Sequence, residues 1–214
     1  MTRKRTSSSA SPRASAGGRS PGVAVWKIKH GDADLCGIGD RTILDRPCLG
    51  LICSVQCPGS IVIKTFEAIR ELRDAGIVVA GGFHSPMEKE CLEFLLRGKQ
   101  PVIVCPAKGL SRPRIPAAWK EAIDAARLLV VSPFAAKRTN KANAQARNEF
   151  VATLATAVLV PHASPGGKAD AVARQVLERG HPLFTFEDEE NAGLLRLGAR
   201  AFSISYIKNS ETHL

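Results

Sequence analysis

Short apolar runs alternate with longer amphipathic stretches along the chain from residue 48 onward. Most of the runs are continuous stretches of Val, Ile and Leu, which is typical of strands that are covered on both faces of a sheet. Apolar strands that alternate with amphipathic helices predict a parallel sheet whose strands are joined by crossover helices. The six predicted strands are residues 48–54, 77–81, 101–105, 128–132, 157–163 and 182–186.

Helical periodicity fills the intervals between these strands. Residues 60–75 bring an apolar side chain to one side at every third position. Ser85, Pro86 and Glu88 have the spacing of a capping box that begins a helix running to about residue 97. We therefore expect an α/β fold with a Rossmann-like, open, mostly parallel sheet of about six strands and helices on both faces. Further helices are predicted over residues 119–127, 140–155 and 168–179.

The first 22 residues are rich in Ser, Gly, Pro and Arg and contain almost nothing to bury. Such a segment cannot offset the conformational entropy of ordering, so we expect residues 1–25 to form a disordered basic tail. Residues 26–214 then form one domain, which is the default for a chain of this length. We expect the tail to be attracted weakly to nucleic acid; its composition also fits an organelle transit peptide, although it has no apolar face for an amphipathic helix.

Several classes of protein are excluded by what the sequence lacks. No stretch approaches the ~20 apolar residues of a membrane-spanning helix, and the N-terminus has no apolar run of a secretory signal. We expect a cytoplasmic protein without a membrane partner. The six cysteines lack the paired C-x-x-C spacing of a zinc site, so no metal site is expected. No cofactor is expected either. Cys53 and Cys57 stand out because they flank a predicted phosphate loop, whose dipoles could lower a thiol pKa.

The positive charge of the chain is concentrated in two blocks. The formal net charge is +10; residues 1–31 contain seven Lys or Arg and no acidic residue, and residues 97–147 contain eleven against two acidic residues. A basic block either faces solvent or attracts phosphate. The sequence leaves open whether the members of the second block share one face.

Small and polar residues follow four of the predicted strands. In an open parallel sheet, ligands bind beyond the carboxyl ends of the strands, where free N–H groups at helix N-termini favour anions. The four loops therefore predict a phosphate-lined crevice. Neither G-x-G-x-x-G nor G-x-x-x-x-G-K-[ST] is present, which disfavours a dinucleotide-dependent dehydrogenase and an ordinary NTPase. The residues predicted to bind phosphate from these loops are Ser54, Gly59, Ser60, Gly82, Ser85, Gly166, Gly167 and Lys168.

Three segments carry a family resemblance. Residues 77–82 (IVVAGG) resemble a "vvSGlA" strand and loop, Arg147-Asn148 matches the start of an "RNRiIa" helix, and residues 158–186 resemble a closing strand–Gly–helix–strand unit. These are motifs of the Rossmann-like domain of the DNA-processing protein A family (DprA/Smf), which is distantly related to the LOG-type nucleotide-binding proteins. The similarity spans about residues 30–200. It implies that Arg147 supplies charge to a ligand and that Asn148 orients the start of its helix.

The resemblance implies single-stranded DNA binding through a positively charged face, a possible homodimer, and delivery of the strand to a recombinase. Two departures remove expected positive charges. Ser-Val-Gln replaces Gly-Ser-Arg in the first loop, and residues 83–86 replace the second loop's Ala-Arg-Gly. The residues that could compensate from neighbouring loops are Lys108, Arg112, Arg114, Lys137 and Arg138.

We interpret the chain as a binder of single-stranded DNA or of a nucleotide phosphate, without catalysis. Phe83, Trp119 and Phe134 are candidates for base stacking. The alternatives are a small-nucleotide sensor and a LOG-type nucleoside monophosphate phosphoribohydrolase, because residues 165–170 resemble that family's P-G-G-x-G-T loop. The catalytic Glu of that loop is replaced by apolar residues here, so Asp170 or Glu149 would have to substitute for it.

Overall fold

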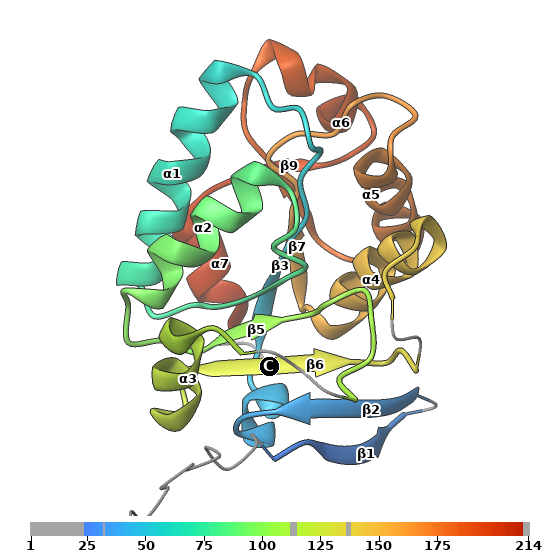
Figure 1. The fold of residues 1–214 in the computed structure, drawn as a ribbon. Coiled ribbons are helices and arrows are strands. Elements are labelled where there is room, and N and C mark those ends of the chain that lie inside the picture. Colours follow the sequence, from blue (N-terminus) through green and yellow to red (C-terminus); the bar gives the residue numbers. More distant parts are fainter. Residues whose placement is uncertain (1–23, 32, 112–114, 136–137, 212–214) are drawn as a thin grey trace, which may run out of the picture.

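The parallel sheet predicted from the sequence is the centre of the molecule. The structure is a computed structural model that describes residues 24–31, 33–111, 115–135 and 138–211, so the predicted tail lies almost entirely outside it. In this part of the chain one sheet has the order β1-β2-β6-β5-β4-β3-β7-β8-β9 (Figure 1). Its strands are β1 (Trp26–His30), β2 (Ala33–Ile38), β3 (Cys48–Leu51), β4 (Val78–Gly81), β5 (Val102–Val104), β6 (Leu128–Ser132), β7 (Ala157–Leu159), β8 (Leu183–Thr185) and β9 (Arg200–Ala201).

All six predicted strands are present as β3 to β8, and every pairing among them is parallel. The expected count of about six is too low, because β1, β2 and β9 add three strands toward the two ends of the sheet. β1 and β2 form an antiparallel hairpin on β6, where β1 has mostly exposed or half-buried residues rather than a continuous apolar run. β9 consists of two exposed residues, which is too short for any periodicity to appear.

Helices cover both faces of the sheet, as predicted (Figure 1). The buried side chains form two separate clusters: one contains residues of α1, α2, α3 and α7, and the other contains residues of α4, α5 and α6. Successive residues of β3 alternate between the two clusters, as side chains of a strand must. The helices are α1 (Gly59–Asp74), α2 (Pro86–Leu96), α3 (Ala117–Asp124), α4 (Lys141–Leu154), α5 (Lys168–Glu178), α6 (Ala192–Arg196) and α7 (Ile204–Glu211).

Local signals fix where the helices begin and end. The predicted capping box is present at α2: Ser85 Oγ accepts from the Glu88 N–H, and the Glu88 carboxylate accepts from the Ser85 N–H. Gly76 follows α1 with a φ of 79°, a left-handed conformation that glycine adopts without strain. Among the described residues, no helix combines the length and hydrophobicity needed to cross a membrane.

Candidate nucleic-acid site

The sheet order brings three of the predicted loops to one place. β4, β3 and β7 are neighbours in the sheet, so the loops that follow them meet at its carboxyl edge. They line a cavity of about 440 Å³ together with the first half of α4. Six of the ten predicted site residues line this cavity, which we call the phosphate cavity: Ser54, Ser85, Arg147, Asn148, Gly167 and Lys168.

Arg147 is the main positive charge of the phosphate cavity. Only 7% of the residue is exposed, and its Nε and Nη2 donate to Asn148 Oδ1 at 3.0 and 2.8 Å. Within the described ranges, no carboxylate lies within ion-pair distance of the guanidinium. A buried charge without a counterion is costly, so this arrangement favours an anionic ligand.

Gly82 makes room for that guanidinium. A β-carbon on Gly82 would overlap the end of the Arg147 side chain. Gly82 therefore contributes to the site because it has no side chain. It does not line the phosphate cavity itself but a neighbouring cavity that is described below. The sequence predicted a backbone contact from Gly82 to phosphate, and that contact stays a prediction.

Glu88 holds the first two loops together, a role that the sequence analysis missed. Its Oε1 accepts from the Cys53 N–H at 3.1 Å, and its Oε2 accepts from the N–H groups of His84 and Ser85 at 2.8 and 3.1 Å. Three amides that could have faced a phosphate thus bind a carboxylate of the protein. Phe83, in the loop after β4, has a left-handed φ of 45° and a buried side chain. The capping-box motif was a signal for one of these bonds only.

The third loop ends at the N-terminus of α5. No side chain caps this helix, and Gly167, Lys168 and Ala169 line the phosphate cavity. Free N–H groups of a first helical turn attract anions. The Ser164 N–H of this loop donates to Ser54 Oγ of the first loop at 2.9 Å, and the Gly166 N–H donates to the Asp170 carboxylate at 3.2 Å.

Gly59, Ser60 and Gly166 line neither cavity. Gly59 and Ser60 are exposed at the start of α1. Hydrogen bonds from Lys64, from the Glu190 backbone and from Ser60 hold the pKa of Asp188 below its usual value. The Ser60 side chain is thus directed toward Asp188.

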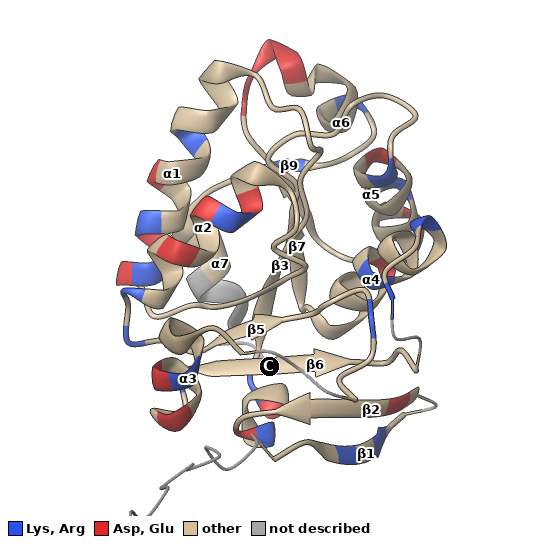
Figure 2. Ribbon diagram, in the orientation of Figure 1, with Lys and Arg blue, Asp and Glu red and all other residues tan. Residues whose placement is uncertain are grey.

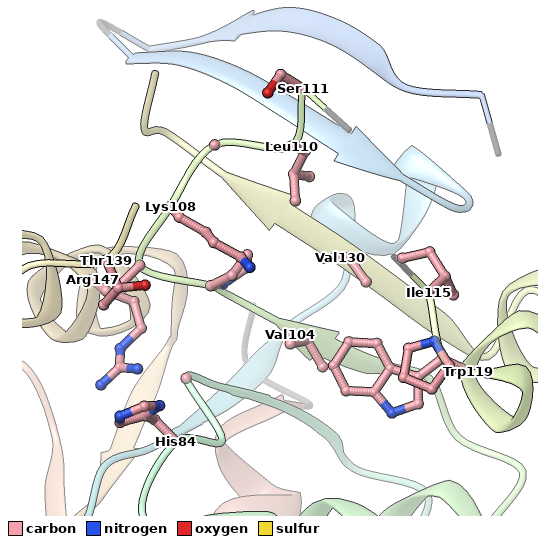
Figure 3. Close-up of a pocket in the computed structure, with 15 residues that line it drawn as sticks. His84, Val104, Lys108, Leu110, Ser111, Ile115, Trp119, Val130, Thr139 and Arg147 are labelled. Atoms are coloured by element: carbon pink, nitrogen blue, oxygen red, sulfur yellow. The ribbon is translucent and has the colours of Figure 1, made fainter. Parts of the chain in front are cut away.

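A second and larger cavity adjoins the first. Its volume is about 870 Å³, and His84 and Arg147 line both cavities. Figure 3 shows His84 and Arg147 together at one end and Trp119 at the opposite end, with Val104 and Val130 between them. We call it the apolar cavity because most of its wall is formed by apolar side chains and prolines.

Cys53 and Cys57 are hydrogen bonded to each other. The Cys53 thiol lowers the pKa of Cys57, and the same bond together with burial raises the pKa of Cys53. The predicted lowering of a thiol pKa therefore applies to Cys57, but its main cause is the neighbouring thiol rather than loop dipoles.

The basic block of residues 97–147 does not share one face. Arg97, Lys99 and Arg127 lie at the amino edge of the sheet, because they precede β5 or β6. Lys108 and Arg138 follow those strands and lie at the carboxyl edge with Arg147. Figure 2 shows Lys and Arg both at the start of α4 and beyond the end of α2. Three further basic candidates, Arg112, Arg114 and Lys137, lie outside the described residues.

Comparisons with solved structures find the same fold. DNA processing protein A from Helicobacter pylori, described for its single-stranded DNA binding mode, matches with a TM-score of 0.69 and 22% identity over 87% of this chain and 90% of that chain. DNA processing protein A (DprA) from Streptococcus pneumoniae matches with a TM-score of 0.67 and 21% identity over 82% of this chain. This match spans only 65% of the Streptococcus chain. The molybdenum cofactor carrier protein from Chlamydomonas reinhardtii is more distant, with a TM-score of 0.53, 13% identity, and coverage of 78% of this chain and 99% of that chain.

Sequence comparison identifies the family. No match was found among curated proteins. The model of the DNA recombination-mediator protein A family matches residues 25–201, which is most of the chain. The resemblance noted in the sequence is thereby confirmed. This chain belongs to the DNA recombination-mediator protein A family.

Proposed function

We propose that this protein binds single-stranded DNA by its phosphate backbone at the carboxyl edge of the sheet, without catalysis. The observation that carries the proposal is the buried Arg147 guanidinium, which has no carboxylate partner in the described part of the chain. Family membership and the DNA binding of the Helicobacter pylori relative support the same ligand. The uncapped start of α5 and the exposed Lys168 beside it add to the attraction of the cavity for phosphate.

The phosphoribohydrolase alternative has weak support. Val172 and Ala173, at the position of that family's Glu, are fully buried in the core. The Asp170 carboxylate is held by the Gly166 N–H and pairs with Arg174 at 3.1 Å. Glu149 accepts from Gln145 on the same helix and does not line the phosphate cavity. Neither Asp170 nor Glu149 is therefore placed to act as a general base in the phosphate cavity.

Substitution of Arg147 tests the proposal. We expect Arg147→Ala to weaken the binding of a labelled oligothymidylate by about tenfold to a hundredfold, the value of a hydrogen bond to a charged group. Fluorescence anisotropy at low and moderate salt measures this loss. Arg97→Ala, which removes an exposed charge at the amino edge, serves as the matched control and should bind like the parent. Equal affinity of Arg147→Ala and the parent, with both folded, would refute the role of Arg147.

A competition experiment separates strand binding from nucleotide sensing. Free nucleotides added to the labelled complex should displace the strand only weakly, because a strand engages several phosphates and a nucleotide engages one. A sensor would show the reverse, with a nucleotide raising the melting temperature and an oligonucleotide leaving it unchanged.

The proposal extends to partners that the resemblance implies. We include a recombinase as the protein partner, which the family's description as a recombination mediator supports, and a homodimer as the working assembly in the cytoplasm. Sedimentation of the protein with and without oligonucleotide measures the assembly. A monomer under both conditions would remove the dimer from the proposal.

A further inference from the structure

Two thiols beside the phosphate cavity have no part in the proposed function. Cys53 and Cys57 lie in the loop between β3 and α1, and their side chains are hydrogen bonded to each other. Cys53 lines the phosphate cavity, as do Val55 and Gln56 between the two cysteines. Both cysteines are free thiols. The two sulfurs are therefore neighbours within a loop that forms part of the wall of the binding site.

The two thiols differ in reactivity. Cys57 is half-buried, so a small reagent from solvent can reach its sulfur, and the hydrogen bond from Cys53 lowers its thiol pKa. Cys53 is only 8% exposed, and its hydrogen bond to Cys57, its burial and the nearby Glu88 carboxylate all raise its pKa. The thiolate form attacks oxidants, and an accessible thiolate beside a second thiol is the arrangement of redox-sensitive cysteines. This difference assigns the first attack to Cys57.

The other four cysteines differ from this pair. Cys48, Cys91 and Cys105 are buried, and burial raises the pKa of Cys91 and Cys105. Buried cysteines in apolar surroundings are inert toward oxidants. Cys36 is half-buried, but its thiol donates to the Ser132 carbonyl at 3.3 Å rather than to a cysteine. Cys36 therefore provides a control for the pair.

We propose that Cys53 and Cys57 are a modification site, which a hydroperoxide oxidises to a disulfide that weakens strand binding in the phosphate cavity. The Cys57 thiolate attacks one oxygen of hydrogen peroxide, the O–O bond breaks, and the departing hydroxide takes up a proton to give water. Cys57 is left as a sulfenic acid. The Cys53 sulfur then attacks the Cys57 sulfur, the S–O bond breaks, and the hydroxyl leaves with the Cys53 proton as a second water. The two thiols lose two electrons and the peroxide gains them.

The disulfide acts on the cavity through the residues between the sulfurs. It holds them about 2.05 Å apart, closer than any hydrogen bond, so the loop must contract. Cys53 is anchored, since its N–H donates to Glu88 and its sulfur accepts from the His162 backbone. The movement therefore falls on residues 54–57. Ser54 is tied to the loop after β7 by two hydrogen bonds of 2.9 and 3.0 Å, which this contraction strains. The effect on the strand rests on the proposed function; formation of the disulfide does not.

Alkylation after peroxide treatment tests the disulfide. The reduced parent is treated with hydrogen peroxide, catalase removes the excess, and the denatured protein is alkylated and digested. The tryptic peptide of residues 42–64 contains Cys48, Cys53 and Cys57, and we expect alkylation at Cys48 alone. Dithiothreitol before alkylation should restore the other two. Cys36→Ser should behave like the parent, and Cys53 should stay alkylated in Cys57→Ser. Alkylation of Cys53 and Cys57 in the treated parent would overturn the modification site.

Anisotropy with labelled oligothymidylate tests the effect on binding. The oxidised parent should bind about tenfold less tightly than the reduced parent, the value of a hydrogen bond to a charged group, and dithiothreitol should reverse the loss. Cys57→Ser should bind like the reduced parent with and without peroxide. Equal affinity of the parent in both states, with the disulfide verified by alkylation, would overturn the effect on binding. Failure of the reduced parent to bind the strand would instead refute the proposed function, and the alkylation result would still stand.

Discussion

The contact between Gly82 and Arg147 shows how one missing side chain positions a charge. Gly82→Ala should move the guanidinium, because the added β-carbon would overlap it. The obstructing atoms are the end of a flexible side chain, so the protein can adapt at a cost below about 1 kcal/mol in unfolding free energy. We expect Gly82→Ala to unfold in urea like the parent but to bind oligothymidylate about tenfold less tightly, close to Arg147→Ala.

Gly193→Ala is the control for this substitution. Gly193 lies in α6, and no atom lies within 4 Å of the place that a β-carbon would take, so the change adds a methyl group without displacing anything. Its binding should equal that of the parent, and its stability should rise by a few tenths of a kcal/mol or more. Unchanged binding in Gly82→Ala would show that Arg147 keeps its function from another position.

At the scale of single residues, the structure shows where each predicted site residue lies, and its role in binding stays a prediction. Arg147 and Asn148 were found by their resemblance to a motif, and Ser54 and Lys168 by their position after strands; all four line the phosphate cavity. Ser60 was predicted on the same grounds but is directed toward Asp188. The direction of a side chain at the start of a helix depends on partners more than 100 residues away, which no local pattern reveals.

At the scale of elements, Glu88 connects α2 to the loops after β3 and β4 through three backbone N–H groups. Glu88→Gln should destabilise the protein by about 1–3 kcal/mol, because a carboxamide offers one acceptor oxygen and turns a donor toward the remaining amides. Urea unfolding measures the loss. Glu90→Gln, an exposed change on the same helix, should be neutral. Equal stability of Glu88→Gln and the parent would mean that the loops are held by packing alone.

The elements of the fold were predictable where their periodicity was strong. The continuous apolar runs of β3 to β8 predicted six strands and their parallel arrangement. β1 and β2 were missed because exposed and half-buried residues are interspersed along both strands, so neither has a continuous apolar run. The sheet order was also beyond the sequence, and it is this order that places the loops after β4, β3 and β7 together.

At the scale of the whole molecule, the sheet separates the described basic residues of the 97–147 block between its amino and carboxyl edges. Affinity for a polyanion depends on the number of cations that contact phosphates, and each contact adds about one unit to the slope of log affinity against log salt. Lys108 lies at the carboxyl edge and lines the apolar cavity, whereas Lys99 precedes β5 at the amino edge. Both are exposed and carry the same charge.

Substitution of these two lysines, one at each edge of the sheet, tests which edge contacts the strand. Lys108→Ala should lower the salt slope of oligothymidylate binding by about one unit, and Lys99→Ala should leave it unchanged. Anisotropy titrations over a series of salt concentrations give both slopes from proteins of identical net charge. If the two variants lose the same slope, the strand is attracted by total charge rather than held at one edge. That result would contradict the proposal that the strand binds at the carboxyl edge beside Arg147.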